Sequence, residues 1–347
     1  MSQSGAFGMK LNSVLVIGGA GLVGASFCHA VARAGYVPIT YDNPKQGHET
    51  RVKWGPLVRG TVFDRDRLNA AVAEYKPDTI VYCPTVSRPE FAMSDPAIAY
   101  RTHLSGTLAL LELARENSIE QFLYVSSAAI YGDAGNQPIR EEQAPSPISP
   151  LGSSFMICER MIRDFASVHR LRFAILRSFS AAGADEDAHL PEDLENSLRL
   201  VPNLIAAAAG LRPQVTLNGS NFTTRDGTTI RDYIHVTDLA HALLLALRTV
   251  EIGAESRIYN IGTGTGTSAL ELAHIAERIS ERRIPIVYGP RRAGDPSTLI
   301  SDSSLARVML GWTPKQSAAD QIIRSAWHEW LEERSSRMTD ARTRVAS

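Results

Sequence analysis

A glycine-rich turn between an apolar strand and a helix constrains this chain more than any other feature. Residues 14–17 are apolar and mostly β-branched, which is typical of a buried strand, and Gly18-Gly19-Ala20-Gly21-Leu22-Val23-Gly24 follows directly. Apolar residues then recur at helical spacing, and Gly35 occupies the position of a helix C-cap glycine. This order is typical of a dinucleotide-binding unit, in which glycines let the backbone approach a pyrophosphate and the helix N-terminus offers free N–H groups.

An acidic residue after the second strand supports this interpretation. Residues 37–41 form a second apolar run that ends at Asp42, about 20 residues after the glycines, where a carboxylate can bind adenosine ribose hydroxyls. A carboxylate there also disfavours a 2′-phosphate, so the sequence predicts NAD rather than NADP. The alternative is a structural turn with a surface aspartate. The predicted cofactor-binding residues are Gly18, Gly21, Leu22, Val23, Gly24, Asp42 and Asn43.

Apolar runs alternate with helical patterns through the first half of the chain. Strands are expected at residues 57–62, 79–83, 122–127 and 173–177, and helices at residues 65–74, 97–117 and 151–169. This alternation predicts an α/β fold with a Rossmann-like, doubly wound parallel sheet that is covered on both faces. Ligands of such sheets bind at the carboxyl ends of the strands, near the point where the strand order reverses.

The second half predicts a smaller, discontinuous α/β lobe that binds the substrate. Helices are expected at residues 200–210 and 233–248, and strands at residues 258–262 and 284–288. We therefore predict a dinucleotide-binding domain from residues 12–180 plus 232–262 and a second lobe from residues 181–231 plus 263–334. Residues 1–11 and 335–347 are expected to be flexible tails, because they are polar and lack a periodic apolar pattern.

Composition excludes several functional classes. The formal net charge of the 347 residues is −1, which gives no electrostatic basis for binding nucleic acid or an anionic membrane. No run of 18 apolar residues and no signal peptide is visible. The three cysteines are far apart in the sequence and lack metal-ligand spacing, so reduced thiols, a cytoplasmic location and no metal site are expected.

Taken together, the motifs resemble the extended short-chain dehydrogenase/reductases and, within them, the UDP-glucose 4-epimerases, over roughly residues 13–330. The motifs that carry the resemblance are the glycine turn, Tyr41-Asp42-Asn43, Ser105-Gly106-Thr107, the stretch from Ser126 to Asp133, the stretch from Asp226 to Val236, the stretch from Tyr259 to Gly264, and Arg291-Arg292-Ala293-Gly294-Asp295. The resemblance implies an NAD-dependent isomerase of galactose metabolism. Such an enzyme moves a hydride from sugar C4 to NAD and returns it to the other face of the 4-keto intermediate.

The resemblance also assigns ligand contacts and an assembly. It implies that Arg231 and Arg292 clamp the diphosphate of a UDP-hexose, that Asp295 binds a ribose, and that Ser180 and Asn218 belong to the same substrate site. It further implies a homodimer formed through the helices of residues 97–117 and 152–169. Two alternatives remain open from the residues alone: a surface ion pair between Arg231 and Asp232, and a solvated basic corner at Arg291-Arg292.

The chain departs from this family at the catalytic residues. The family uses a Tyr and a Lys four residues apart on one helix, assisted by a Ser. In this sequence Leu151 and Phe155 occupy the Tyr and Lys positions, and only the assisting Ser127 is retained. Neither replacement transfers protons. The replacement bases considered are His103, Cys83, Ser153, Ser180 and His189, of which His103 has the most suitable intrinsic pKa.

Three functions are therefore compatible with the sequence. The first is a UDP-glucose 4-epimerase-like protein that binds NAD and a UDP-hexose and has weak or unconventional activity. The second is an inactive UDP-sugar-binding pseudoenzyme. The third is another NAD-dependent modification of a nucleotide sugar, with His103 or a substrate group as the acid.

Overall fold

The computed structural model describes residues 12–43, 49–84, 91–135, 137–190, 192, 194, 197 and 199–346, with side chains except at residues 91–92 and 336–346. The predicted N-terminal tail, residues 1–11, lies outside the described residues.

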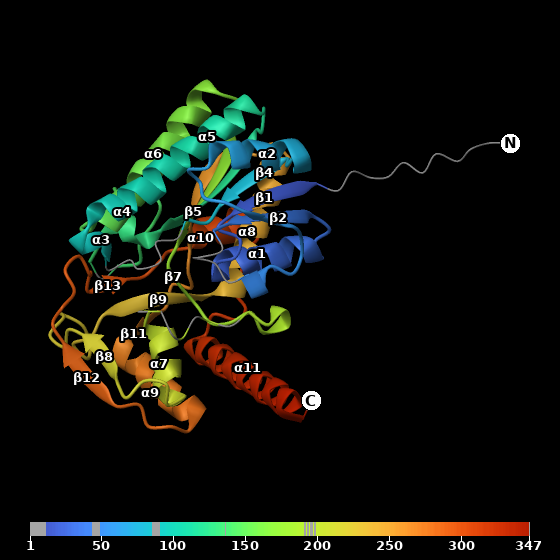
Figure 1. Ribbon diagram of the computed structural model, residues 1–347. Coiled ribbons are helices and arrows are strands. Elements are labelled where there is room, and N and C mark those ends of the chain that lie inside the picture. The colour runs from blue at the N-terminus through green and yellow to red at the C-terminus, as the bar shows by residue number, and fades with distance from the viewer. Residues whose placement is uncertain are drawn as a thin grey trace.

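A seven-stranded parallel sheet forms the larger part of the molecule (Figure 1). Its strands are β1 (Ser13–Ile17), β2 (Val37–Asp42), β3 (Leu57–Arg59), β4 (Thr79–Tyr82), β5 (Gln121–Ser127), β6 (Arg172–Ser178) and β10 (Arg257–Ile261), in the order β10-β6-β5-β4-β1-β2-β3. Because β1 pairs with both β2 and β4, the strand order reverses beside β1. The predicted doubly wound parallel sheet is confirmed, and its ligand crevice is expected at the carboxyl end of β1.

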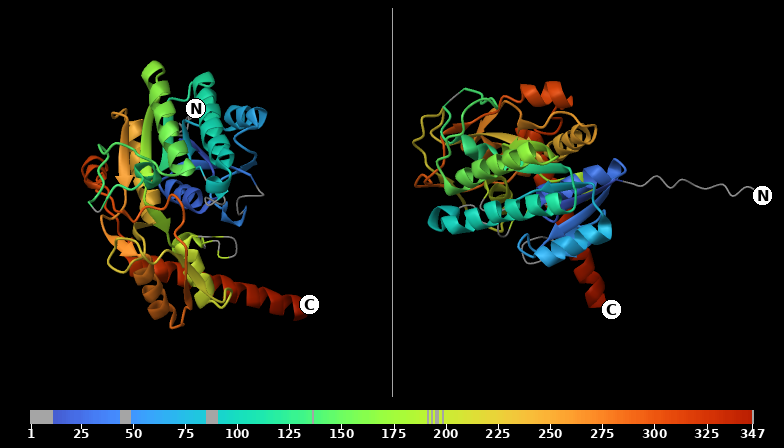
Figure 2. Two further views of the ribbon diagram at one scale, coloured as in Figure 1. Left: turned by 90° about the vertical axis from the view of Figure 1, so that its left-hand side faces the viewer. Right: turned by 90° about the horizontal axis from the view of Figure 1, so that it is seen from above.

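Helices cover both faces of this sheet (Figure 2). One face packs against α2 (Arg65–Tyr75), α5 (Gly106–Glu116) and α6 (Pro150–Val168), and the other against α1 (Leu22–Arg33), α8 (Val236–Glu251) and α10 (Ser304–Leu310). In β1, Leu15 and Ile17 join the first core, whereas Val14 and Val16 join the second. Burial on both faces explains why the strands read as continuous apolar runs.

The second lobe lies below the large sheet in Figure 1 and has its own core. Strand β9 (Ile230–His235) pairs with β7 (Ser180–Ala182), β11 (Gly266–Ser268) and β13 (Thr298–Leu299). A separate pair joins β8 (Val215–Asn218) to β12 (Ile286–Gly289), and the helices are α7 (Leu200–Ala208), α9 (Ala269–Ser280) and α11 (Ala319–Ala346). The remaining short helices are α3 (Phe91–Ser94) and α4 (Pro96–Tyr100), with single 3₁₀ turns at Glu49–Arg51, Ala128–Tyr131 and Glu186–Ala188.

Several elements differ from the sequence-based expectation. The helix expected from residue 233 begins at Val236, because residues 233–235 complete β9 and the His235 side chain accepts from the N–H of Thr237 to cap α8. The helix expected over residues 97–117 is interrupted by a π-helical segment, Arg101–Ser105. The Tyr82 hydroxyl donates to the Thr102 carbonyl at 3.1 Å within this segment.

Helices α11 and α10 bear on the predicted C-terminal tail and on the predicted lobe boundaries. Helix α11 continues to Ala346 and therefore includes most of the stretch expected as a C-terminal tail; its end projects from the body (Figure 2). Helix α10 packs against α8 and β10, although the predicted boundaries place it in the second lobe. In the described part of the chain, no helix has the length and apolar character needed to span a bilayer.

Candidate functional site

One cleft of about 1620 Å³ extends from the carboxyl ends of β1 and β2 into the second lobe. Its volume exceeds the roughly 300–1,000 Å³ of a typical small-molecule site, so it has room for more than one ligand of that size. All of the predicted site residues line it: Gly18, Gly21, Leu22, Val23, Gly24, Asp42, Asn43, His103, Ser127, Leu151, Phe155, Ser180, Asn218, Arg231, Arg292 and Asp295.

The glycine turn needs its glycines for steric reasons. Gly18 has φ +80°, and a Cβ added there would lie 2.3 Å from the Cys83 carbonyl oxygen. A Cβ added at Gly24 would lie 2.2 Å from the Gly18 carbonyl oxygen. The N-cap of α1 is Gly21, and among the described residues no side chain caps this helix end. Its first-turn N–H groups are therefore available to an anion in the cleft.

Asp42 links the end of β2 to the glycine turn. Its carboxylate accepts from the N–H groups of Ala20 at 2.8 Å and Asn43 at 2.7 Å. Burial raises the pKa of Asp42, and these hydrogen bonds oppose that effect by stabilising the charged form. Because each carboxylate oxygen has two lone pairs, the group can also accept from a pair of sugar hydroxyls.

The middle of the cleft is apolar on one side. Leu151 and Phe155 lie in the first turns of α6, which Ser149 caps by accepting from the N–H of Gly152 at 3.1 Å. Ser127 ends β5 at the carboxyl edge of the sheet, and its hydroxyl accepts from the N–H of Ala129 at 3.1 Å. The Phe155 ring packs against the ring of His103, with centroids 4.5 Å apart.

His103 lies in the π-helical segment and is fully buried. Its Nδ1 is 2.9 Å from the Ser154 hydroxyl, which donates to the Leu151 carbonyl at 2.7 Å. Because a hydroxyl has one proton, Nδ1–H donates to Ser154 and Nε2 is unprotonated. This Nε2 has no hydrogen-bond partner among the described residues. Burial lowers the pKa of His103 to about 4, so the imidazole is neutral at pH 7.

The other proposed replacement bases are less suitable. Cys83 is buried, and burial raises the pKa of its thiol far above neutrality. Ser180 lines the cleft, but Ser153 and His189 are not among the lining residues. Of the two histidines considered, only His103 therefore belongs to this cleft.

Arg231 and Asp295 face each other at the far end of the cleft. They form an ion pair, and Nη2 of Arg231 also donates to the Pro296 carbonyl at 2.8 Å. The neighbouring Asp232 is buried and instead accepts from the N–H groups of Thr263 at 2.8 Å and Ser301 at 3.0 Å. A surface ion pair between Arg231 and Asp232 is therefore not formed in the described structure.

Arg292 is held by Asn218 at the end of β8. With the amide oriented so that its oxygen faces the guanidinium, this oxygen accepts from Nε at 3.0 Å and from Nη2 at 3.1 Å. Arg291 lies elsewhere: it stacks on the Phe222 ring at 4.2 Å and donates to the Asn221 side chain at 2.7 Å. Only Arg292 of this arginine pair lines the cleft.

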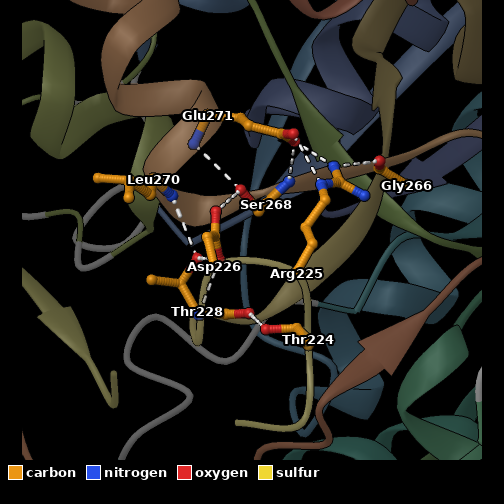
Figure 3. Close-up of polar contacts among 8 residues, drawn as sticks. All are labelled: Thr224, Arg225, Asp226, Thr228, Gly266, Ser268, Leu270 and Glu271. Carbon is orange, nitrogen blue, oxygen red and sulfur yellow. Dashed lines mark hydrogen bonds and ion pairs between the residues drawn. The ribbon is translucent and has the colours of Figure 1, made fainter. Parts of the chain in front are cut away.

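The motif before β9 fixes the loop that leads to Arg231 (Figure 3). Asp226 accepts from the N–H of Thr228 at 2.9 Å and from the Ser268 hydroxyl. Ser268 and Glu271 form a capping box at the start of α9. Arg225 donates to the Gly266 carbonyl at 3.0 Å and pairs with Glu271. These contacts give the motif a structural role and join its loop to β11 and α9.

The structure adds lining residues that the sequence analysis did not identify. The N-terminal residues of α7, Leu200 to Asn203, line the second-lobe end of the cleft, together with Arg199 and Arg212. Arg199 pairs with Glu192 and donates to the Ala181 carbonyl at 3.0 Å. In the sequence, these two arginines flank the helix predicted at residues 200–210. Their spacing does not indicate that this helix lies against the cleft.

The sheet, the uncapped helix N-terminus and the two-ended cleft define a nucleotide-binding α/β protein. A comparison with protein families matches residues 14–262 to the NAD dependent epimerase/dehydratase family, and the chain belongs to this family.

Individual relatives agree with this assignment. The chain is 40% identical over 320 residues to a UDP-glucose 4-epimerase of Rhizobium meliloti, covering 92% of this chain and 97% of that protein. Its fold is similar to a Brucella ovis UDP-glucose 4-epimerase in complex with NAD (TM-score 0.87, 39% identity, 91% and 97% coverage). It is also similar to a Bifidobacterium longum UDP-glucose 4-epimerase in complex with NAD⁺ and UDP (TM-score 0.87, 28% identity, 93% and 98% coverage).

Proposed function

We propose that this chain is a UDP-glucose 4-epimerase-like protein that holds NAD and a UDP-hexose end to end in one cleft. The observation that carries the proposal is the continuity of the cleft, with Gly18, Gly24 and Asp42 at one end and Arg231 and Arg292 at the other. Relatives named as UDP-glucose 4-epimerases, some solved with NAD or UDP, support it.

The residues at the sheet end fit NAD. Gly18 and Gly24 leave room for a pyrophosphate beside the uncapped start of α1, and Asp42 offers its carboxylate to the adenosine ribose. When bound, NAD supplies the acceptor and donor of the C4 hydride.

The residues at the second-lobe end fit a nucleoside diphosphate. Arg292 is oriented by Asn218, and Arg231 is paired with Asp295. Guanidinium groups bind phosphate oxygens with two parallel hydrogen bonds. Asp295 then offers an acceptor for the ribose hydroxyls, and Ser180 lies in the same cleft.

Proton transfer limits the reaction. Epimerisation at C4 needs a base for the sugar hydroxyl as the hydride leaves, and Leu151 and Phe155 cannot act as one. The remaining candidates in the cleft are the Ser127 and Ser180 hydroxyls and Nε2 of His103, whose low pKa makes it a weak base. Losing a positioned base typically reduces the rate by about 10²–10⁴. The apolar wall also favours, as the alternative, a UDP-sugar-binding pseudoenzyme or another NAD-dependent nucleotide-sugar modification.

Mass spectrometry of the nucleotides released from the purified protein tests the binding proposal. We expect NAD, a UDP-sugar or both. A parallel assay that follows conversion of UDP-glucose to UDP-galactose should give a rate at least a hundredfold below that of an epimerase with the usual Tyr and Lys. Release of neither nucleotide, together with no binding of added NAD and UDP, would contradict the proposal.

Restoring the acid–base pair tests the assignment of Leu151 and Phe155. The double variant Leu151→Tyr with Phe155→Lys should raise the epimerisation rate at least tenfold, because a phenol and an ammonium then share one helix face. A matched control, Leu151→Phe with Phe155→Leu, keeps the wall apolar and should not raise the rate. An unchanged rate in the restored variant, despite intact NAD and UDP binding, would mean that another group limits the reaction.

We also propose a homodimer formed through α5 and α6 and a cytoplasmic location. The three cysteines are free and buried, as expected for thiols in a reducing compartment.

A further inference from the structure

A second cluster of titratable side chains lies outside the cleft, between α11 and the turn at Glu186–Ala188. His189 follows this turn with φ +49°, and Glu329 and Glu332 lie one helical turn apart on α11. One potential ligand atom from each residue lies within 4.8 Å of the other two. Nδ1 of His189 is 3.8 Å from Oε1 of Glu329 and 3.4 Å from Oε2 of Glu332.

Glu329 is the unusual member of this cluster. Its side chain is only 4% exposed, and its buried Oε2 has no hydrogen-bond partner among the described residues. A buried carboxylate oxygen without a partner is costly, because it has lost its water and gained no donor. A bound cation would remove this cost.

The charges around Glu329 favour a cation. The negative carboxylates of Glu332 and Glu186 interact electrostatically with Glu329. Lys53 and His189 are the positive groups that do so. The Lys53 ammonium, however, donates to the backbone carbonyls of Ala188 at 2.8 Å and His189 at 3.1 Å. Two further carboxylates therefore act on Glu329, and the Lys53 ammonium is directed to backbone carbonyls.

We propose that His189, Glu329 and Glu332 bind a divalent transition-metal ion of the Zn²⁺ class. One imidazole and two carboxylates form a three-ligand donor set that suits Zn²⁺, with water completing the coordination. His189 is 67% exposed and Glu332 is 63% exposed, which leaves the metal an entry path.

The metal would fasten α11 to the nucleotide-binding part of the molecule. Ala188 and Leu190, on either side of His189, pack in one small core with Leu22 and Ala25 of α1. Leu22 also lines the cleft. The ion therefore links the C-terminal helix to the helix whose N-terminus faces the cleft, and it acts as a structural clamp.

Calorimetric titration of metal-stripped full-length protein with Zn²⁺ at pH 7.5, without nucleotides, tests the proposal. We expect one Zn²⁺ per chain at this site. Glu329→Gln and His189→Asn should each weaken binding at least tenfold; Asn is chosen because it tolerates positive φ. The control His328→Gln removes a histidine of the same helix that pairs with Glu186 at 3.6 Å, and it should leave the affinity unchanged.

Thermal unfolding distinguishes a variant that no longer binds Zn²⁺ from one that no longer folds. In a chelator, Glu329→Gln should unfold at or above the wild-type temperature, whereas Zn²⁺ should raise the midpoint only in wild type. Absence of Zn²⁺ binding in wild type, or wild-type Zn²⁺ affinity in both Glu329→Gln and His189→Asn, would overturn the proposal.

Discussion

Gly24 lies so close to the Gly18 carbonyl that any side chain must displace the turn. Gly24→Ala should therefore reduce the NAD that copurifies with the protein at least tenfold, and overpacking should cost about 1–3 kcal/mol of stability. Mass spectrometry of released nucleotides gives the first value and urea unfolding the second. Ala32→Ser near the other end of α1 is the control, and it should retain NAD. Full NAD content in Gly24→Ala would exclude the turn as the pyrophosphate site.

His103 gives a pH prediction at the same scale. Its pKa of about 4 in the folded protein lies below the usual value near 6.5, because burial disfavours the imidazolium. The unfolded chain therefore binds the proton first as the pH falls. The stability from burying neutral imidazole is complete above pH 6.5 and is lost toward pH 4, by at most about 3 kcal/mol.

The variant His103→Asn isolates this contribution. We expect its free energy of unfolding to fall less steeply than that of wild type between pH 6.5 and pH 5, as measured by denaturant titration at several pH values. Buried His235, whose pKa burial also lowers to about 4, contributes equally to both proteins. Parallel pH profiles for the variant and wild type would show that His103 does not titrate as described.

Helix α6 is joined to β6 by a buried ion pair. Nη2 of Arg177 is 2.7 Å from Oε2 of Glu159, and Nη1 of Arg177 donates to the Tyr131 hydroxyl at 2.7 Å. The Ser126 hydroxyl donates to the same carboxylate at 2.6 Å. This network joins the middle of α6 to β5 and β6, and its two charged members do not line the cleft.

Removing one partner of this ion pair should lower the free energy of unfolding. Arg177→Leu leaves the Glu159 charge buried and unpaired, so we expect a loss of about 3–5 kcal/mol in the free energy of unfolding. The double variant Arg177→Leu with Glu159→Leu should lose less, because no uncompensated charge remains. Urea unfolding of both variants measures the difference. A double variant that is less stable than Arg177→Leu would show that the pair itself contributes more than its desolvation costs.

At the scale of the whole molecule, the proposed dimer face is only partly apolar. On α6, Ile162 is fully buried in the core, while Met156, Met161 and Phe165 are partly buried against it. Leu108 of α5 is 41% exposed and remains available for a partner.

We expect the double variant Leu108→Glu with Met161→Glu to sediment as a monomer and wild type as a dimer. Val308→Glu on α10, at a site 78% exposed, should leave the dimer intact. Equal sedimentation of all three proteins would contradict this assembly.

The sequence by itself determined the features that depend on neighbouring residues. The strand, turn and helix around Gly18 to Gly24 and the aspartate at the end of β2 follow from local periodicity, because backbone preferences act over a few residues. The resemblance to the family, and not periodicity, marked positions 151 and 155. Ordered motifs then predicted the family and the fold. The same reasoning misplaced the start of α8, since residues 233–235 pair in β9 with strands that are distant in the chain.

Only the tertiary structure decided which distant side chains meet. It paired Arg231 with Asp295 rather than with Asp232, placed the buried His103 beside Phe155, and brought His189 to Glu329. Each contact joins segments separated by many residues, so no periodic pattern records it. Packing of the two lobes and of α11 sets these distances, and the desolvation that packing causes sets the charge states of the groups that meet there.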